Sequence, residues 1–181
     1  MKCIDLKIDE SVKEDISKLY LSAFPIDERP PLDWFLRCLY ECENNHAFAY
    51  YDNDEFIGFS EITIFEDIVY ICYLAVSPIH RNKGYGTQIL DNIKQKYNGY
   101  TILLCFEEVD EKYDDYLNRK RREDFYIRNG FINNDLKTKE GPVIYQSSRI
   151  GDKKVNFDQY RHIFDQCYGK GTSDIYLKEA K

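Results

Sequence analysis

Residues 70–97 have the sequence YICYLAVSPIHRNKGYGTQILDNIKQKY, and the character of this segment changes twice along its length. The first eight residues are almost continuously apolar, which is typical of a strand buried on both faces. Pro78 ends this run and leads into a loop at 81–87, RNKGYGT, which contains two glycines. From 87 to 97 the apolar residues recur at helical spacing. The segment therefore predicts a buried strand, a glycine loop and an amphipathic helix.

The loop at 81–87 combines the properties of an anion-binding site. Glycine lets the backbone approach a ligand closely, and the first N–H groups of the following helix carry partial positive charge. Arg81 and Lys83 add full charges. A Rossmann fingerprint is excluded because Ile89 stands where its last small residue belongs, and a Walker loop is excluded because its Lys is missing. The loop predicts a pyrophosphate site, with an ordinary strand-to-helix turn as the alternative.

Hydrophobic periodicity on either side of this segment predicts the other elements. A capping box of Ser11 and Glu14 is expected to open the first helix. The dipeptide Asn53-Asp54 indicates a hairpin turn. The tail from Gly169 onward is expected to be loose. The expected strands span residues 2–8, 47–52, 55–65, 68–77, 101–106, 131–138 and 142–149, and the remaining helices lie around 32–39, 119–129 and 156–168.

This order predicts an α/β fold in which a mixed sheet carries helices on both faces. The 181 residues fit a single domain, with a core at 1–150 and an amphipathic helix appended at 156–168. The formal net charge of −7 argues against nucleic acid or an anionic membrane as a partner. Six cysteines without a CxxC spacing indicate free thiols in the cytoplasm. The three histidines lack the spacing of metal ligands, so no metal is expected.

Two motifs in this chain resemble those of the GNAT superfamily, the acetyl-CoA-dependent N-acetyltransferases. The segment at 70–97 is similar to its motif A, an apolar strand followed by Arg/Gln-x-x-Gly-x-Gly/Ala and a helix. The segment at 124–131, DFYIRNGF, is similar to its later F-Y-x-x-x-G-F element. The segments DERPP (27–31) and EEVD (107–110) resemble an uncharacterised bacterial branch of this superfamily.

The resemblance implies a mostly antiparallel sheet in which two parallel strands, here 70–77 and 101–108, splay apart. Acetyl-CoA would enter between them. The backbone of Leu74, Ala75 and Val76 would pair with its pantetheine arm. Its pyrophosphate would be held by the Arg81 side chain and by N–H groups of Lys83, Gly84, Tyr85, Gly86 and Thr87.

The resemblance also suggests catalytic residues. Tyr126 would donate a proton to the departing thiolate. Some members carry a Glu base early in the strand before the loop, but Tyr70 stands there in this chain. Glu107 and Glu108 are then the candidates for the general base, and adjacent strand residues face opposite sides, so at most one can face the site. Weaker candidates are Glu28, Glu61 and a chain of water molecules.

The usual Asn and Ala of the later helix are replaced, on this count, by Arg119 and Arg122. These arginines would contact the cofactor or lie in solvent. The function implied is transfer of an acetyl group to a primary amine of a small molecule or a peptide. The alternative is a non-catalytic sensor or interaction module that binds acyl-CoA. The identity of the amine, and whether the chain forms a homodimer, stay open.

Overall fold

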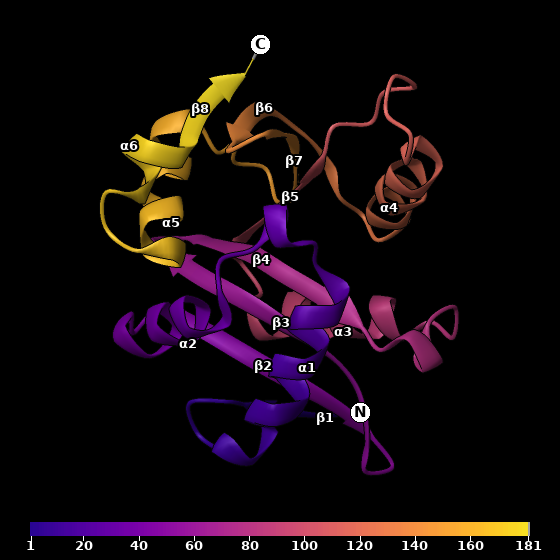
Figure 1. Cartoon of the computed structure of the whole chain (residues 1–181). Helices are drawn as coiled ribbons and strands as arrows, with labels where there is room; N and C mark the ends of the chain where they lie inside the picture. The colour runs from indigo at the N-terminus through magenta and orange to yellow at the C-terminus, as the bar shows by residue number, and fades with distance from the viewer. Residues whose placement is uncertain (181) are drawn as a thin grey trace.

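The computed structural model describes residues 1–180, apart from the side chain of Asp27. Eight strands form one sheet, with helices on both of its faces (Figure 1). The strands are β1 (Lys2–Asp5), β2 (Asn45–Asp52), β3 (Glu55–Phe65), β4 (Ile68–Val76), β5 (Thr101–Glu107), β6 (Ile132–Glu140), β7 (Val143–Ile150) and β8 (Leu177–Ala180). The helices are α1 (Lys13–Ala23), α2 (Leu32–Glu41), α3 (Tyr85–Lys96), α4 (Tyr116–Arg128), α5 (Phe157–Tyr168) and α6 (Thr172–Tyr176). Short 3₁₀ turns lie at η1 (Glu10–Val12), η2 (Ile26–Glu28) and η3 (Pro78–His80).

The strand order in the sheet is β1-β2-β3-β4-β5-β7-β6-β8. Every neighbouring pair is antiparallel except β4 and β5, which run parallel because α3 crosses between them. The predicted mixed sheet with one parallel pair is therefore confirmed. The hairpin turn is also confirmed, since both Asn53 and Asp54 adopt the left-handed conformation that such a turn requires.

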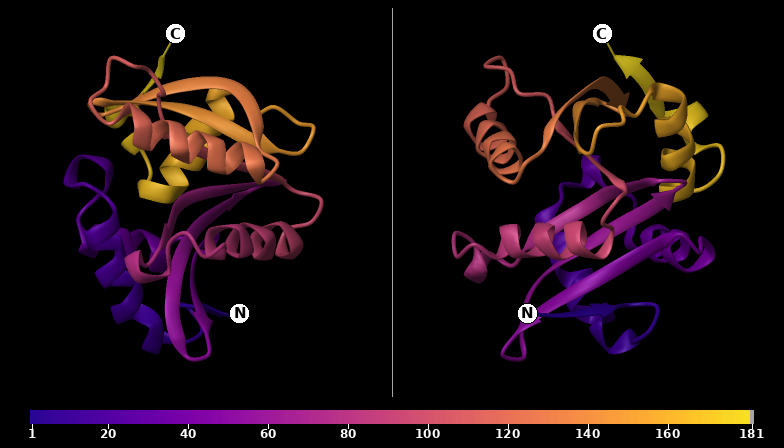
Figure 2. Two further views of the ribbon diagram at one scale, coloured as in Figure 1. Left: turned by 90° about the vertical axis from the view of Figure 1, so that its right-hand side faces the viewer. Right: turned by 180° about the vertical axis from the view of Figure 1, so that it is seen from behind.

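Apolar residues divide into cores on the two faces of the sheet. One core lies under α3 and α4 and includes Ile89, Leu90 and Ile93 of α3. On the other face, α1 and α2 cover the first four strands, and α5 covers β4, β5 and β6. Figure 2 shows this arrangement from the side, with α1 and α3 on opposite sides of the sheet. In α3 and α5 the buried residues lie on one face, as their predicted amphipathic pattern requires.

The start of the first helix differs from the prediction. The chain first makes the turn η1, and Asp9 caps it by accepting a hydrogen bond from the Ser11 N–H at 2.9 Å. Glu14 instead forms a salt bridge with Lys18, one turn further along α1. The predicted capping box was therefore wrong. Asp9 is as good a cap as Ser11, and its position two residues earlier moves the start of the helical turn.

Residues 169–180 of the C-terminal tail are ordered rather than loose, and Lys181 lies outside the described residues. After Gly169 the chain forms α6, and β8 then pairs with β6 as the last strand of the sheet. The Asp165 carboxylate accepts the Ser173 N–H at 2.8 Å, and Leu177 is buried against the core under α5. Each piece is too short to give a clear periodic pattern, so this ordering depends on tertiary contacts that the sequence pattern does not reveal.

All six cysteines are free; Cys38 and Cys167 are buried, and the other four are partly buried. Within residues 1–180, no helix has both the length and the apolar character that a membrane span needs.

Candidate active site

The parallel pairing between β4 and β5 covers only the first half of β4. It runs from Ile68 opposite Thr101 to Ile71 opposite Leu104 and ends there. Beyond this point β4 stays paired with β3, and β5 stays paired with β7. The two central strands therefore separate, as the resemblance implied, and leave a split that opens toward their C-terminal ends.

Peptide groups of β4 face this split. The Ser77 N–H donates to the carbonyl of Ile57 in β3 at 2.8 Å. Because strand residues alternate in direction, the peptide groups of every second residue before Ser77 also point toward β3. Ala75 therefore faces β3, whereas Leu74 and Val76 face the split. Consistent with this, the Val76 carbonyl accepts a hydrogen bond from Arg81 Nε at 3.2 Å on that side. Leu74 and Val76 thus offer N–H and C=O groups to a ligand placed between the strands.

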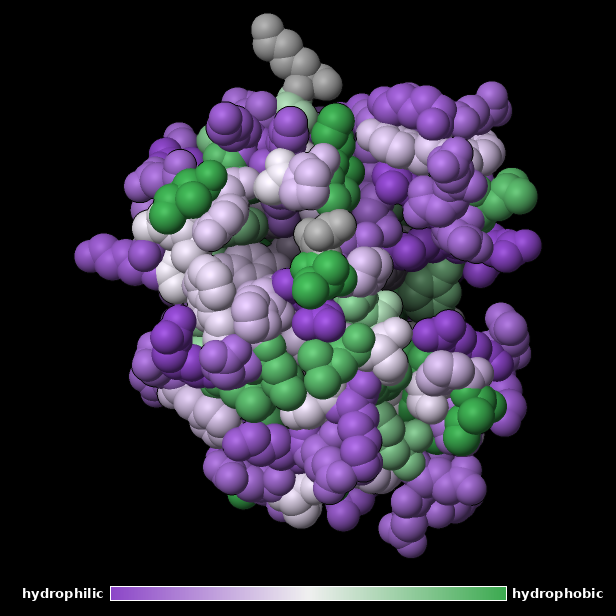
Figure 3. Space-filling model, viewed as in Figure 1, coloured by the Kyte–Doolittle hydropathy of each residue, from purple (hydrophilic) through white to green (hydrophobic). Residues whose placement is uncertain are grey.

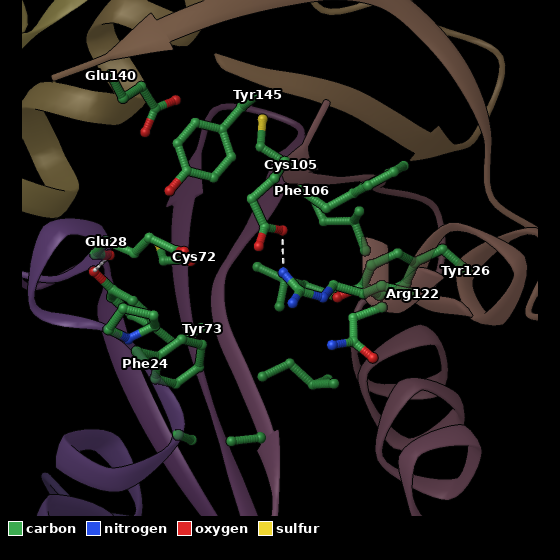
Figure 4. A pocket seen from close by; sticks show the side chains of 18 of the residues that line it. Phe24, Glu28, Cys72, Tyr73, Cys105, Phe106, Arg122, Tyr126, Glu140 and Tyr145 are labelled. Atoms are coloured by element: carbon green, nitrogen blue, oxygen red, sulfur yellow. Dashed lines mark hydrogen bonds and ion pairs between the residues drawn. The ribbon is translucent and has the colours of Figure 1, made fainter. Parts of the chain in front are cut away.

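The split is a cavity of roughly 570 Å³. Its walls come mainly from β4, β5, α4 and the segment after α1, with single residues from β6, β7 and α5. Figure 3 shows that the surface is hollowed here. In the close view of Figure 4, Arg122 and Tyr126 lie on one side, and Glu28, Tyr73 and Glu140 lie on the other. The cavity reaches Arg81, where the glycine loop begins.

The loop brings the chain sharply from β4 into α3. Asn82 and Gly84 both have positive φ, and Gly84 is the residue that caps α3, at φ +82°. A Cβ built on Gly84 would meet no heavy atom within 4 Å, whereas one on Gly86 would lie 3.0 Å from the Phe125 ring. Gly84 is thus needed for the backbone conformation and Gly86 for the close packing of α3 against α4. The first N–H groups of α3 have no acceptor within the helix and are available to an anion.

The side chains of the loop behave differently from one another. Lys83 is exposed, and Arg81 lines the cavity. The Tyr85 hydroxyl donates to Asp52 at 2.9 Å, so this side chain points toward the end of β2. Only the backbone of Tyr85 is therefore available to a ligand.

One face of α4 lines the cavity at a spacing of four residues: Asn118, Arg122 and Tyr126. Arg119 lies on another face, where it donates to the Asp115 carboxylate and to the Glu108 carbonyl. Of the two arginines singled out in the sequence, only Arg122 reaches the cavity. An amide side chain, Asn118, lies on this face one residue before Arg119, and steps of four from Tyr126 lead to it.

The two acidic residues at the end of β5 have separate environments. Glu107 is 2% exposed, lines the cavity and forms a salt bridge with Arg122. Glu108 lies outside the cavity lining and bonds to Lys112, Lys137 and the Tyr113 hydroxyl, which hold its pKa at about 2. As strand alternation predicts, only one of the pair faces the cavity.

Tyr126 is 9% exposed and packs between the rings of Phe106 and Phe131. Burial raises the pKa of its phenol to about 12, although the nearby Arg122 opposes this shift. The hydroxyl therefore stays protonated at neutral pH and can donate a proton.

A second cavity of roughly 340 Å³ adjoins the first on the side of α5. Glu28, Tyr73, Glu140, Tyr145 and Tyr168 line both cavities. Periodicity did not identify Glu140 or Tyr145, because they belong to the β6–β7 hairpin and reach the site only through the tertiary fold.

Of the other residues singled out in the sequence, Glu61 lies away from both cavities, whereas Tyr70 lines the first one. Glu61 is 4% exposed and lines neither cavity, and burial raises its pKa to about 7. Tyr70 is buried and hydrogen-bonds to the Tyr160 hydroxyl at 2.9 Å. No group of three His, Cys, Asp or Glu side chains placed to hold a metal occurs in the described part of the chain.

Comparison with solved structures shows that other proteins share this fold. A protein from Bacteroides thetaiotaomicron assigned to the GNAT family superposes with a TM-score of 0.78 at 23% identity, over 93% of this chain and 99% of that one. The ribosomal-protein-S18-alanine N-acetyltransferase of Escherichia coli gives 0.60 at 15% identity, over 86% and 99% of the two chains. The aminoglycoside 6'-N-acetyltransferase of Enterococcus faecium gives 0.60 at 16% identity, over 84% and 99%.

No curated protein sequence matches the chain significantly. A family model described as an acetyltransferase (GNAT) domain matches residues 43–133, which is half of the chain. The match runs from the start of β2 into β6 and includes the split strands, the glycine loop and α4. The chain belongs to the GNAT family of acetyltransferases.

Proposed function

We propose that this protein transfers an acetyl group from acetyl-CoA to a primary amine of a small molecule or a peptide. The observation that carries this proposal is the split between β4 and β5, where the peptide groups of Leu74 and Val76 face a cavity instead of a strand. A pantetheine arm contains amides and is able to pair there as a strand would. The similar structures named for alanine and aminoglycoside N-acetylation support an amine as the acceptor.

The loop between β4 and α3 suits the pyrophosphate of acetyl-CoA. In the proposed complex, N–H groups from Lys83 to Thr87 donate to its oxygens, and the Arg81 guanidinium adds positive charge. Two observations support this fit: α3 is a full helix of 12 residues, and the space around Gly84 is open. Leu74 and Val76 contribute their backbone, while Ala75 keeps β4 attached to β3.

In the proposed reaction, the amine nitrogen attacks the thioester carbon, and the bond from that carbon to sulfur breaks. An N–H of β4 that faces the split stabilises the negative charge that develops on the carbonyl oxygen. Tyr126 gives its proton to the departing thiolate. The amine must also lose a proton, and Glu107, which faces the cavity, already has Arg122 as the partner of its carboxylate.

Release of free thiol from acetyl-CoA in the presence of a panel of primary amines tests this function. We expect release above background with at least one amine, together with thermal stabilisation by acetyl-CoA of about 2.7 kcal/mol at a hundred times its dissociation constant. A protein that is stabilised but releases no thiol with any amine would be the binding module instead. The free thiols of the chain support a reducing compartment such as the cytoplasm.

A further inference from the structure

Glu140 ends β6 at the place where the two cavities meet, and it lines both of them. Hydroxyl groups hold one of its oxygens: Tyr160 donates to Oε1 at 2.8 Å, and Thr138 donates to the same atom at 2.9 Å. Within the described residues, Oε2 accepts no hydrogen bond. One oxygen is therefore fixed by the protein, and the other remains available to a ligand in the cavity.

The hydroxyl that holds Glu140 belongs to a longer network. Tyr160 lies on α5, and its hydroxyl also hydrogen-bonds to that of Tyr70 on β4 at 2.9 Å. Both tyrosines are buried. Three elements, β4, α5 and β6, therefore fix the direction of this carboxylate. The match to the family model ends at residue 133, whereas α5 and most of β6 lie beyond it. The Glu140 carboxylate is therefore positioned largely by the part of the chain that the family model does not cover.

The groups that face Glu140 are not charged at neutral pH. They are Tyr160 of α5, Tyr70 of β4, Cys105 of β5 and Tyr145 of β7, and the pKa of each is raised. Neighbouring β8 presents Leu177 opposite Glu140. Glu140 forms no salt bridge within the described residues, unlike Glu107 and Glu108. Burial therefore dominates and raises the pKa of Glu140 to about 7, although the two hydroxyl hydrogen bonds oppose it.

The space beside Glu140 has room for an acceptor. The second cavity is walled by aromatic side chains from α2, α5 and α6, among them Trp34, Phe164 and Tyr176. In Figure 4 the Glu140 carboxylate lies across the pocket from Arg122 and Tyr126, whereas the Glu28 carboxyl is near enough to Glu107 and Arg122 to be affected by both charges. Arg29 also lines this cavity, but its Nε donates to the Phe24 carbonyl and its guanidinium lies over the Tyr20 ring. An ammonium bound in this cavity would lie beside both Glu140 and the split, because the two cavities share this part of their walls.

We propose that Glu140 is the general base of the acetyl transfer, an inference that rests on the proposed function. Oε2 takes one proton from the acceptor ammonium, and the neutral amine then forms the bond to the thioester carbon. As the bond to sulfur breaks, the thiolate takes the proton of the Tyr126 hydroxyl, and the second proton of the amine restores that hydroxyl. Glu140 releases its proton to solvent, so each turnover gives an amide, CoA thiol and one proton.

The pH dependence of turnover tests this assignment in the full chain. With an amine whose own pKa is above about 9, the wild-type kcat should fall on acidification with a midpoint near 7, where Glu140 becomes protonated. Glu140→Gln should lower kcat by about 100-fold or more and remove this acidic limb. The affinity for acetyl-CoA should not change. Glu28→Gln, in the same cavity, should keep the limb; if that variant loses it instead, the base is Glu28.

A second variant guards against misfolding of Glu140→Gln. Tyr160→Phe removes one hydrogen bond that favours the charged form of Glu140 and keeps the buried ring. The acidic limb of kcat should therefore move to higher pH, by roughly half a unit to one unit. A residue that only supported the fold would lower activity equally at all pH values, and an unmoved limb in Tyr160→Phe overturns the proposal.

The two proposals fail in different ways. If wild-type protein binds acetyl-CoA but transfers its acetyl group to no amine, the proposed function itself is wrong. If the wild type is active and Glu140→Gln retains both its rate and its acidic limb, only the assignment of Glu140 is wrong.

Discussion

Tyr126 shows how a single side chain combines packing and chemistry. Its ring is buried between Phe106 and Phe131, while its position in the cavity allows the hydroxyl to reach a leaving group. We expect Tyr126→Phe to keep the fold and the affinity for acetyl-CoA but to lower kcat by about 100-fold, since only the proton donor is lost. Steady-state thiol release and calorimetric binding would measure the two effects.

Tyr97 provides the matched control, because it is equally exposed at 9% but lines neither cavity. Tyr97→Phe should leave kcat at the wild-type value. Equal turnover in Tyr126→Phe and wild type would remove the Tyr126 hydroxyl from the mechanism.

Single residues were predictable where a local rule places them. Strand alternation correctly predicts that only one of Glu107 and Glu108 faces the cavity, although not which one. Counting back from Tyr126 along the family motif leads to Arg119 as a residue of the site. The cavity, however, is lined by Asn118, Arg122 and Tyr126, which lie four residues apart on one face of α4. A miscount of one residue rotates a helical position by about 100°, so motif counting is less reliable there than the helical period.

In the proposed complex, the loop between β4 and α3 and the first turn of α3 together hold the pyrophosphate of acetyl-CoA. Gly84→Glu would place a carboxylate beside the first N–H groups of α3, where it competes with the pyrophosphate. We expect affinity to fall by at least about 100-fold, as the added negative charge also repels the phosphates. Isothermal titration calorimetry with acetyl-CoA measures this loss directly.

Gly99→Glu separates this effect from backbone strain. Gly99 also has positive φ, at +91°, and a Cβ there would likewise meet no heavy atom within 4 Å. Both variants should therefore lose about 1 kcal/mol of stability, but Gly99→Glu should bind acetyl-CoA normally. Equal affinity in the two variants would mean that the pyrophosphate lies elsewhere.

Long elements with a clear hydrophobic period were predictable from sequence, and short ones were not. The three strands β3, β4 and β5 and the helix α3 contain enough apolar residues to define both type and limits within a few positions. By contrast, α6 has five residues and β8 has four. These two elements are ordered because α6 packs against α5 and β8 pairs with the open edge of β6. The sequence of the tail alone does not reveal either contact.

At the scale of the whole molecule, the cavity lies between two parts of the chain that are distant in sequence. Tyr70, Glu140 and Tyr160 are linked by hydrogen bonds, yet 90 residues separate the first from the last. Sequence pattern alone cannot detect such a contact, because each residue lies in an element that would form without it. The sequence suggested Glu107 or Glu108, beside the family motifs, as the base. The proposed base Glu140 instead lies on the β6–β7 hairpin, outside those motifs.

The buried carboxyl of Glu61 should make the stability of the whole molecule depend on pH. It lies on β3 opposite Tyr73, forms no salt bridge within residues 1–180, and Lys7 is the cation that acts on it. Burial raises its pKa from 4.5 to about 7, so between these values the folded state binds more protons than the unfolded state. The contribution of Glu61 to stability therefore falls as pH rises through this window and stays at its low value above pH 7.

Glu61→Gln should remove this dependence, because the amide fits the same space without titrating. Relative to wild type, the variant should gain on the order of 2 kcal/mol in the free energy of unfolding between about pH 5 and about pH 8, which urea titration at both pH values would measure. Glu41→Gln, on the exposed end of α2, controls for the loss of a charge and should run parallel to wild type. If the Glu61→Gln curve is also parallel to wild type, Glu61 is charged in the folded protein, and the site beneath α1 and α2 must contain a compensating group.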